Sequence, residues 1–494
     1  MNENTKSYHI FLFPFRLKDC DGWETEIEKT NWERDAFEYA KGSYERNFSS
    51  QAYFYEFASG AIFDDNSPNR IVTQYRLSIG DDASYTIKIY GKPFEYKLHI
   101  DKILLNVYDD KVGILSFHLN NETYGDFDDI LRINDFGRRI FPQYLSQDNG
   151  IVGPKSSFLA DSICLDLNNG HVYEDDFEQY AKCTIPPFTL PKFIKGILPS
   201  SMRNAHWLLD DRMYVISWYV NNEMSGKLSK ISFREGEISF DNDTFKKWYK
   251  YVFVDNNDLT CQSERMFQQL LSKATYDRWL KYGTVCGVSR YSFVVLGSLE
   301  YSTFFRDVVL GHIQTMYFNM VSLCLAQRTM GLYYSNEIAE ISNTLRTDAK
   351  NDKELFLRVQ KLSNDYLRYV NNIYFREITP QDQGIELYEM LQSQTAIGRD
   401  EKELNTEIEQ LFNYINMTSD QKRNEFAQIL NMIAAIAVPA TIITGVFGMN
   451  PFPDSDSTWG NFWCEILLIA LLIGIVIGGM KLYYRKNNRR KKHE

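Results

Sequence analysis

A stripe of small and polar residues runs through the most apolar part of the chain. Its members follow one another at spacings of three and four residues: Asn424, Ala427, Asn431, Ala434, Val438, Thr441, Gly445 and Gly448. Residues with this spacing share one face of a helix. Such a face could line a water-filled pore, or it could let membrane helices pack closely. The stripe alone leaves both interpretations open.

Two segments near the C-terminus are apolar enough to cross a membrane. Residues 426–447 carry no charge, and residues 466–480 are apolar apart from glycine. Each lies in a stretch of about 20 residues, which as a helix spans a bilayer core of about 30 Å. We therefore expect a transmembrane helix at 426–449, an external loop at 450–461 and a second transmembrane helix at 462–484.

Charge is unevenly distributed along the chain. Residues 481–494 hold seven Lys or Arg and one Glu, a net charge of +6, whereas the whole chain carries −11. A basic tail next to a membrane helix places the C-terminus in the cytoplasm, and two crossings place the N-terminus there too. Residues 485–494 would be the cytoplasmic part of this tail. The alternative is that the tail binds anionic lipid or nucleic acid. The polar start of the chain predicts no secretory signal.

Three regions are expected before the first membrane helix: a mixed α/β domain at 1–300, a helical hairpin at 301–380 and a stalk helix at 381–425. Strands are predicted from alternating or aromatic-rich runs at 8–16, 71–79, 85–90, 96–107, 112–119 and 213–220. Helices are predicted at 32–44, 244–251, 264–281, 304–345 and 353–375.

The stalk shows a heptad pattern. Apolar residues recur every seven positions, with others at the neighbouring heptad position: Met390, Ile397, Leu404 and Leu411, then Leu387, Ile408 and Ile415. We expect one helix from Ile385 to Phe447, roughly 95 Å long. Its first part would pack on other helices of the chain or on copies of itself. A bend near Thr418 to Asp420 is the alternative.

The end of the first membrane helix carries a family signature. It consists of the string Gly445-Val446-Phe447-Gly448-Met449-Asn450, followed by Pro453-Asp454, Trp459-Gly460 and the second apolar segment. This arrangement resembles the CorA magnesium-transporter family over about 70 C-terminal residues. The resemblance implies a funnel-shaped homopentamer in the bacterial inner membrane, with the long helix lining a central pore and the second span in an outer ring.

The resemblance also assigns roles to single residues. In the family the asparagine of the G-M-N string stands at the outer pore mouth, so Gly448, Met449 and Asn450 are expected there. Neutral oxygens suit Mg²⁺, which loses its water reluctantly, and no tightly bound cofactor is implied. Asp454 and Asp456 would form acidic rings, with a solvated turn as the alternative. Three residues depart from commoner family types, which bears on pore narrowing and ion selectivity: Ala427, Val438 and Phe447.

The long N-terminal part adds a second resemblance. Its opening at 8–16 and the segment 207–213 resemble divergent CorA-like proteins found beside type III CRISPR systems, which implies a membrane effector opened by a nucleotide second messenger. An adenine nucleotide would need cations and aromatic faces. The candidates are Arg138, Arg139, Arg212, Tyr144 and Trp218, each with a structural role as the alternative.

Other functional classes have less support. The chain has no Walker loop, G-x-G-x-x-G, H-E-x-x-H or G-x-S-x-G motif, so we expect no enzyme, and we expect no direct nucleic-acid partner. The acidic groups 126–129 and 174–176 are expected to face solvent. Two alternatives to a nucleotide-gated channel stay open. One is a divalent-metal uptake transporter closed by intracellular Mg²⁺, and the other is a module that its spans merely anchor.

Overall fold

The computed structural model describes most of the chain before residue 449. The described residues are 4–17, 22–35, 52–63, 67, 70–89, 94–140, 160–177, 190–203, 206–207, 212–300, 303–347, 352–448, 467, 470, 471, 474 and 478. They fall into two compact units, one of residues 1–347 and 361–408 and the other of residues 348–360 and 409–494.

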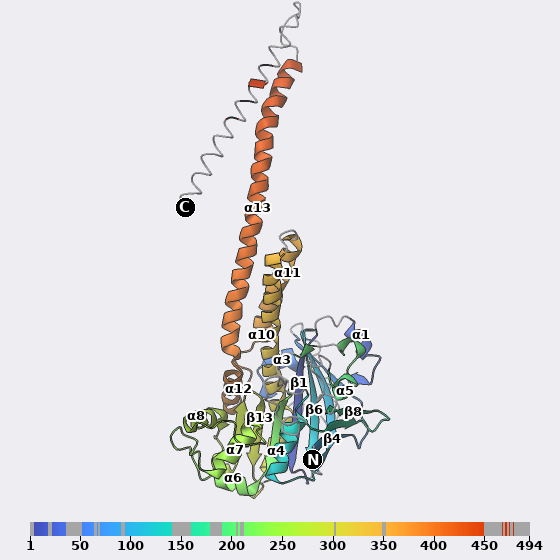
Figure 1. Ribbon diagram of the computed structural model, residues 1–494, viewed down its shortest axis with the longest axis vertical. Coiled ribbons are helices and arrows are strands. Elements are labelled where there is room, and N and C mark those ends of the chain that lie inside the picture. Colours follow the sequence, from blue (N-terminus) through green and yellow to red (C-terminus); the bar gives the residue numbers. More distant parts are fainter. Residues whose placement is uncertain are drawn as a thin grey trace, which may run out of the picture. The chain divides into compact units, whose positions relative to one another are not determined.

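Within the described residues, thirteen strands form a single sheet in the first unit (Figure 1). The main path runs β11-β12-β13-β10-β1-β6-β5-β4-β7-β8, with β2 on β3, β3 on β5 and β9 on β1. Pairing is antiparallel throughout except between β10 and β13. The strands are β1 Ser7–Arg16, β2 Trp32–Arg34, β3 Val72–Leu77, β4 Ser84–Ile89, β5 Phe94–Tyr108, β6 Val112–Asn121, β7 Ser162–Asp166, β8 Val172–Asp176, β9 His206–Trp207, β10 Tyr214–Val220, β11 Thr275–Tyr276, β12 Val285–Ser289 and β13 Ser292–Gly297.

Shorter helices surround the sheet in the first unit. They are α1 Trp23–Ile27, α3 Glu56–Phe63, α4 Phe127–Gly137, α5 Lys192–Lys195, α6 Asn222–Leu228, α7 Asp243–Phe253 and α8 Glu264–Ala274, with 3₁₀ turns η4 Ser200–Met202 and η5 Leu280–Tyr282. Polar residues begin three of them, because the Asn221, Asn242 and Ser263 side chains accept hydrogen bonds from the backbone N–H groups of Met224, Thr244 and Met266.

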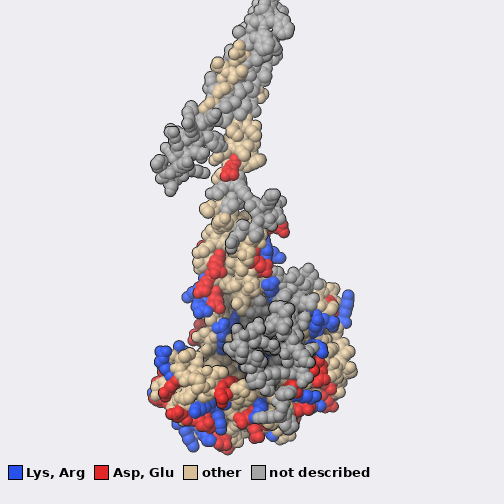
Figure 2. Space-filling model, viewed as in Figure 1, with Lys and Arg blue, Asp and Glu red and all other residues tan. Residues whose placement is uncertain are grey.

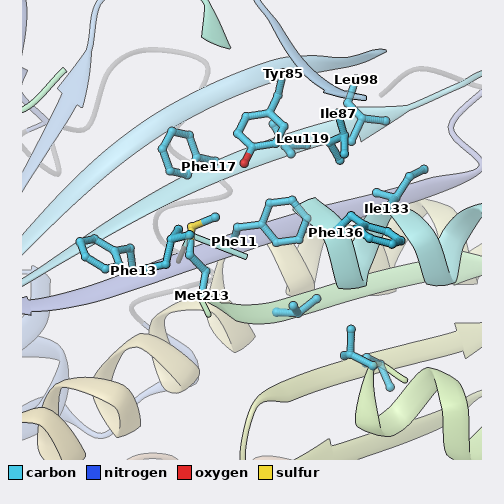
Figure 3. Close-up of a cluster of buried hydrophobic side chains, with 14 of the residues drawn as sticks. Phe11, Phe13, Tyr85, Ile87, Leu98, Phe117, Leu119, Ile133, Phe136 and Met213 are labelled. Carbon is cyan, nitrogen blue, oxygen red and sulfur yellow. The ribbon is translucent and has the colours of Figure 1, made fainter. Parts of the chain in front are cut away.

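The centre of the sheet is covered on both faces. Every residue of β1 and of β6 is buried. Successive side chains alternate between faces, so Phe11, Phe13 and Phe15 share one hydrophobic cluster. Figure 3 shows Phe11 beside Ile133 and Phe136 of α4 in this cluster. On the other face, Ser322 of a long helix hydrogen-bonds to the Tyr108 hydroxyl of β5 at 2.8 Å.

The six predicted strands and the helices predicted at 244–251 and 353–375 are confirmed, with shifts of one to three residues at most boundaries. The helix predicted at 304–345 is divided at Thr315, which separates α9 from α10. The helix predicted at 32–44 is wrong at its start. Trp32–Arg34 is strand β2, in which Trp32 is opposite Leu77 and its indole donates to the Ile197 carbonyl at 2.7 Å. The helix predicted at 264–281 ends at Ala274, because Thr275 and Tyr276 pair with β12.

Long helices follow the sheet. They are α10 Met316–Thr347, α11 Asp352–Asn372, α12 Asp382–Thr395 and α13 Ile397–Gly448, and α10 is preceded by a π-helical turn Phe305–Val309 and α9 Leu310–Gln314 (Figure 1). The single helix predicted from Ile385 is wrong at one point: Ala396 takes a left-handed φ of 60° and separates α12 from α13. α13 continues as one helix through residues 418–420, where two separate helices were the alternative.

Six of the seven heptad residues are buried within one chain, and Met390 is half-buried. Leu387, Ile397, Leu404, Ile408, Leu411 and Ile415 are each at most 9% exposed. Of the two packing partners that the sequence left open, the other helices of the same chain therefore cover this seam.

One helix in the described residues is long and apolar enough to cross a membrane, and it is Phe305–Thr344 rather than a predicted span. Within its most apolar window 61% of the residues are buried, and Ser322 and Gln327 hydrogen-bond to other parts of the fold. We therefore interpret it as a core helix. Most side chains of the predicted spans at 426–449 and 462–484 lie outside the described residues.

Candidate pore helix and ligand sites

The 424–434 segment of α13 is uncovered within its own chain. The stripe residues Asn424, Ala427, Asn431 and Ala434 are exposed. The large apolar residues on the other faces are exposed as well: Phe426 by 65%, Ile429 by 46%, Leu430 by 52% and Ile433 by 56%. In Figure 2, tan atoms predominate in the described part of this helix, while blue and red are spread over the sheet-containing unit. A helix with this much exposed apolar surface is expected to contact lipid or other subunits.

The remaining stripe residues continue along α13 toward its end. Val438, Thr441 and Gly445 lie within the helix, Thr441 is exposed, and Gly448 is the last helical residue. The side chain of Val438 is not described. Met449, Asn450, Asp454 and Asp456 lie outside the described residues, so their roles stay predictions.

Buried hydroxyl groups hold the start of α13 and the end of α11 in the fold. The Tyr366 hydroxyl donates to the Glu401 carbonyl at 3.1 Å, and the Tyr369 hydroxyl donates to the Gln327 carbonyl at 3.3 Å. The Gln327 amide donates in turn to the Ile373 carbonyl at 2.8 Å and to the Tyr388 hydroxyl of α12 at 3.0 Å. These bonds join α10, α11, α12 and the first turn of α13.

The structure brings three predicted ligand residues together. Arg138 and Arg139 both donate to Asp135 Oδ1, at 3.3 and 2.9 Å, and Arg139 forms a backbone bridge with Arg212. Arg138 is 2% exposed, and burial lowers the pKa of its guanidinium to about 10 despite the attraction of Asp135. Sequence reasoning missed Asp135, the acidic partner one helical turn before the two arginines. A structural role accounts for these contacts, and nucleotide binding stays a prediction.

The other two predicted ligand residues lie elsewhere. Trp218 is fully buried and stacks on Phe305 with ring centroids 4.8 Å apart. Tyr144 lies outside the described residues.

Two acidic residues differ from the expectation of solvent exposure. Asp129 is half-buried and pairs with Arg132 at 3.2 Å. Asp175 is buried and accepts a hydrogen bond from the Lys192 backbone N–H at 2.5 Å. Asp126, Asp128, Glu174 and Asp176 are exposed as predicted. Among the described residues, no group of His, Cys, Asp or Glu is arranged to hold a metal ion.

Comparison with known proteins identifies the C-terminal part of the chain. Residues 334–480 match the family described as CorA-like Mg2+ transporter protein. Residues 334–480 of this chain are a CorA-family domain. No curated protein matches the chain.

The CorA match begins inside α10 and includes α11, α12, α13 and most of the second predicted span. It therefore contains the exposed 424–434 segment and the Gly448-Met449-Asn450 string. The family assignment indicates a channel or transporter for divalent cations in a membrane. The whole sheet lies before residue 334, outside the match.

Proposed function

We propose that this chain forms a homopentameric cation channel of the bacterial inner membrane, with α13 lining the pore and both termini in the cytoplasm. The observation that carries the proposal is the 424–434 segment, which is exposed on its polar stripe and on its apolar faces within a CorA-like domain. In a pentamer the stripes would meet around the pore. The apolar faces would contact neighbouring subunits and lipid, and residues 462–484 would form the outer ring.

The pore mouth would be formed by Gly448, Met449 and Asn450. Five asparagine amides would present neutral oxygens to a hydrated divalent cation, which would hold it without trapping it. Asp454 and Asp456 would raise the local cation concentration by forming acidic rings just outside.

The gate would be controlled by the sheet-containing unit. This unit holds α12 and the first turns of α13, so a change in its packing would reach the pore helix directly. Because the sheet lies outside the CorA match, we favour an adenine-nucleotide second messenger in type III CRISPR defence as the opening signal. The alternative is a divalent-metal uptake transporter that intracellular Mg²⁺ closes.

The test combines native mass spectrometry with ion flux into liposomes that contain the full chain. We expect a pentamer, and flux that appears when adenine nucleotides are presented on the cytoplasmic face. Flux that Mg²⁺ alone shuts off would support the uptake transporter instead. A monomer with no flux under either condition would contradict both the nucleotide-gated channel and the uptake transporter.

A further inference from the structure

A cavity of about 600 Å³ lies in the first unit at the edge of the sheet, beside β12. Aromatic side chains line it from two elements: Trp279 and Tyr282 from the region of η5, and Phe304 and Phe305 from the start of the π-helical turn. Gln383 of α12 lines it as well. Its volume falls in the range of small-molecule sites, about 300–1000 Å³.

The chemistry of the lining is neutral and aromatic. The described residues that line this cavity include no Asp, Glu, Lys or Arg, and burial lowers the pKa of the one histidine among them, His312. Tyr282 is 75% exposed and Phe304 is 57% exposed, so both side chains lie partly at the surface of the cavity. Thr284 and Gln383 add uncharged donors and acceptors. Stacked aromatic faces with a few neutral polar groups suit an uncharged planar ring and offer no counter-ion to phosphate.

One wall of the cavity is rigidly supported. Phe305 stacks on Trp218 at an interplanar angle of 18°, and the Trp218 indole donates to the Phe305 carbonyl at 3.2 Å. A side chain at Gly297 would collide with the Phe305 ring, so glycine is needed where the strand meets this wall. π-Helical turns such as Phe305–Val309 are frequent at functional sites.

The wall of the cavity formed by α12 is also held in place, because α12 is bonded to the same edge of the sheet. Glu386 accepts hydrogen bonds from Arg278 and Tyr276, and Arg278 also pairs with Asp382 at 3.4 Å. Farther along α12, the Gln394 amide donates to the Lys273 carbonyl at 3.0 Å. A molecule in the cavity would therefore touch the sheet edge, the π-helical turn and α12 at once.

We infer that this cavity is a binding site for an uncharged planar heteroaromatic group. The group stacks between the rings of the η5 region and those of the π-helical turn, with its polar edge toward Gln383 and Thr284. The inference goes beyond the proposed channel, because binding at this site requires no ion flux.

Saturation-transfer difference NMR on the full chain in lipid nanodiscs tests the site with three uncharged planar probes: indole, quinoline and adenosine. We expect saturation transfer to at least one of them. Phe304→Ala and Tyr282→Ala should each weaken its binding by roughly 5- to 100-fold, since removing one stacking partner typically has this effect. Both side chains are mostly exposed, so both variants should fold.

Phe57→Ala is the matched control. Phe57 is also 57% exposed, lies in α3 and is not one of the residues that line the cavity. It should leave probe binding unchanged. Absence of transfer to all three probes, or an equal loss in the Phe57 variant, would overturn the inference. Because no step measures ion flux, these outcomes are independent of whether the channel proposal holds.

Discussion

Helix α10 and the 424–434 segment of α13 are both rich in apolar residues, and they meet opposite surroundings. Val321, Leu325 and Ala326 of α10 are at most 1% exposed, and the polar Gln327 among them has hydrogen-bond partners inside the fold. On α13, apolar Ile433 and polar Asn431 are both exposed. Apolar composition alone therefore does not identify a membrane helix. The difference lies in whether the chain covers the helix itself.

The largest expected effect on stability comes from comparing a Phe→Ala substitution at a buried position with one at an exposed position. Phe117 of β6 is fully buried near Tyr85 and Phe193, so Phe117→Ala should lower the free energy of unfolding by about 3–5 kcal/mol. Phe426→Ala should change it by less than about 0.5 kcal/mol, because Phe426 is 65% exposed. Urea unfolding of the full chain in detergent, followed by circular dichroism, measures both. Equal losses would show that the fold covers Phe426 too.

The next effect is a pH dependence of stability that comes from a buried histidine in the sheet. His9 of β1 is fully buried, its Nδ1 lies 2.7 Å from Asn134 Oδ1 and its Nε2 lies 2.8 Å from Ser7 Oγ. Burial lowers the pKa of His9 from 6.5 to about 4. The unfolded chain therefore takes up a proton between these values while the folded chain does not, and stability falls as pH falls through this window, by about 3 kcal/mol at most.

His9→Gln should flatten that pH dependence. Burial also lowers the pKa of His118, so part of the slope should persist in the variant. Urea midpoints at pH values from 7 to 4 measure the difference between the wild type and the variant. An unchanged slope would show that the pKa of His9 does not differ between the folded and the unfolded chain.

A smaller effect is expected where the region before the CorA match meets the match itself. Arg368 of α11 pairs with Asp109 at the β5–β6 turn at 2.9 Å, and Arg368 is 55% exposed. Arg368→Ala should therefore cost about 0–1 kcal/mol, and 0.5 M salt should remove most of that loss. A loss above about 3 kcal/mol that salt does not change would mean that the contact is far better shielded than its exposure indicates.

The sequence predicted the features that depend on local pattern. Alternation identified β1 and β3 to β6, and the heptad residues identified a seam that proved to be buried. It did not predict β12 and β13, because both strands are fully buried and show no alternation. The break at Ala396 was also missed, since an alanine with a left-handed φ is set by the surrounding packing and not by its own preference.

The candidate site divides in the same way. The G-M-N string and the stripe of small and polar residues could be identified from residue types and their spacing in the sequence. The aromatic cavity joins residues near 280, 305 and 383, which only the folded chain brings together.

The central claim is that the uncovered helix lines a cation pore with Asn450 at its mouth. The most direct test measures Mg²⁺ flux into liposomes, under the condition that opens the wild type, for Asn450→Ala and for Asn413→Ala. Asn413 is an exposed asparagine earlier on α13 and serves as the matched control. We predict a strong change in flux for Asn450→Ala and wild-type flux for Asn413→Ala. Wild-type flux in the Asn450 variant would contradict the account.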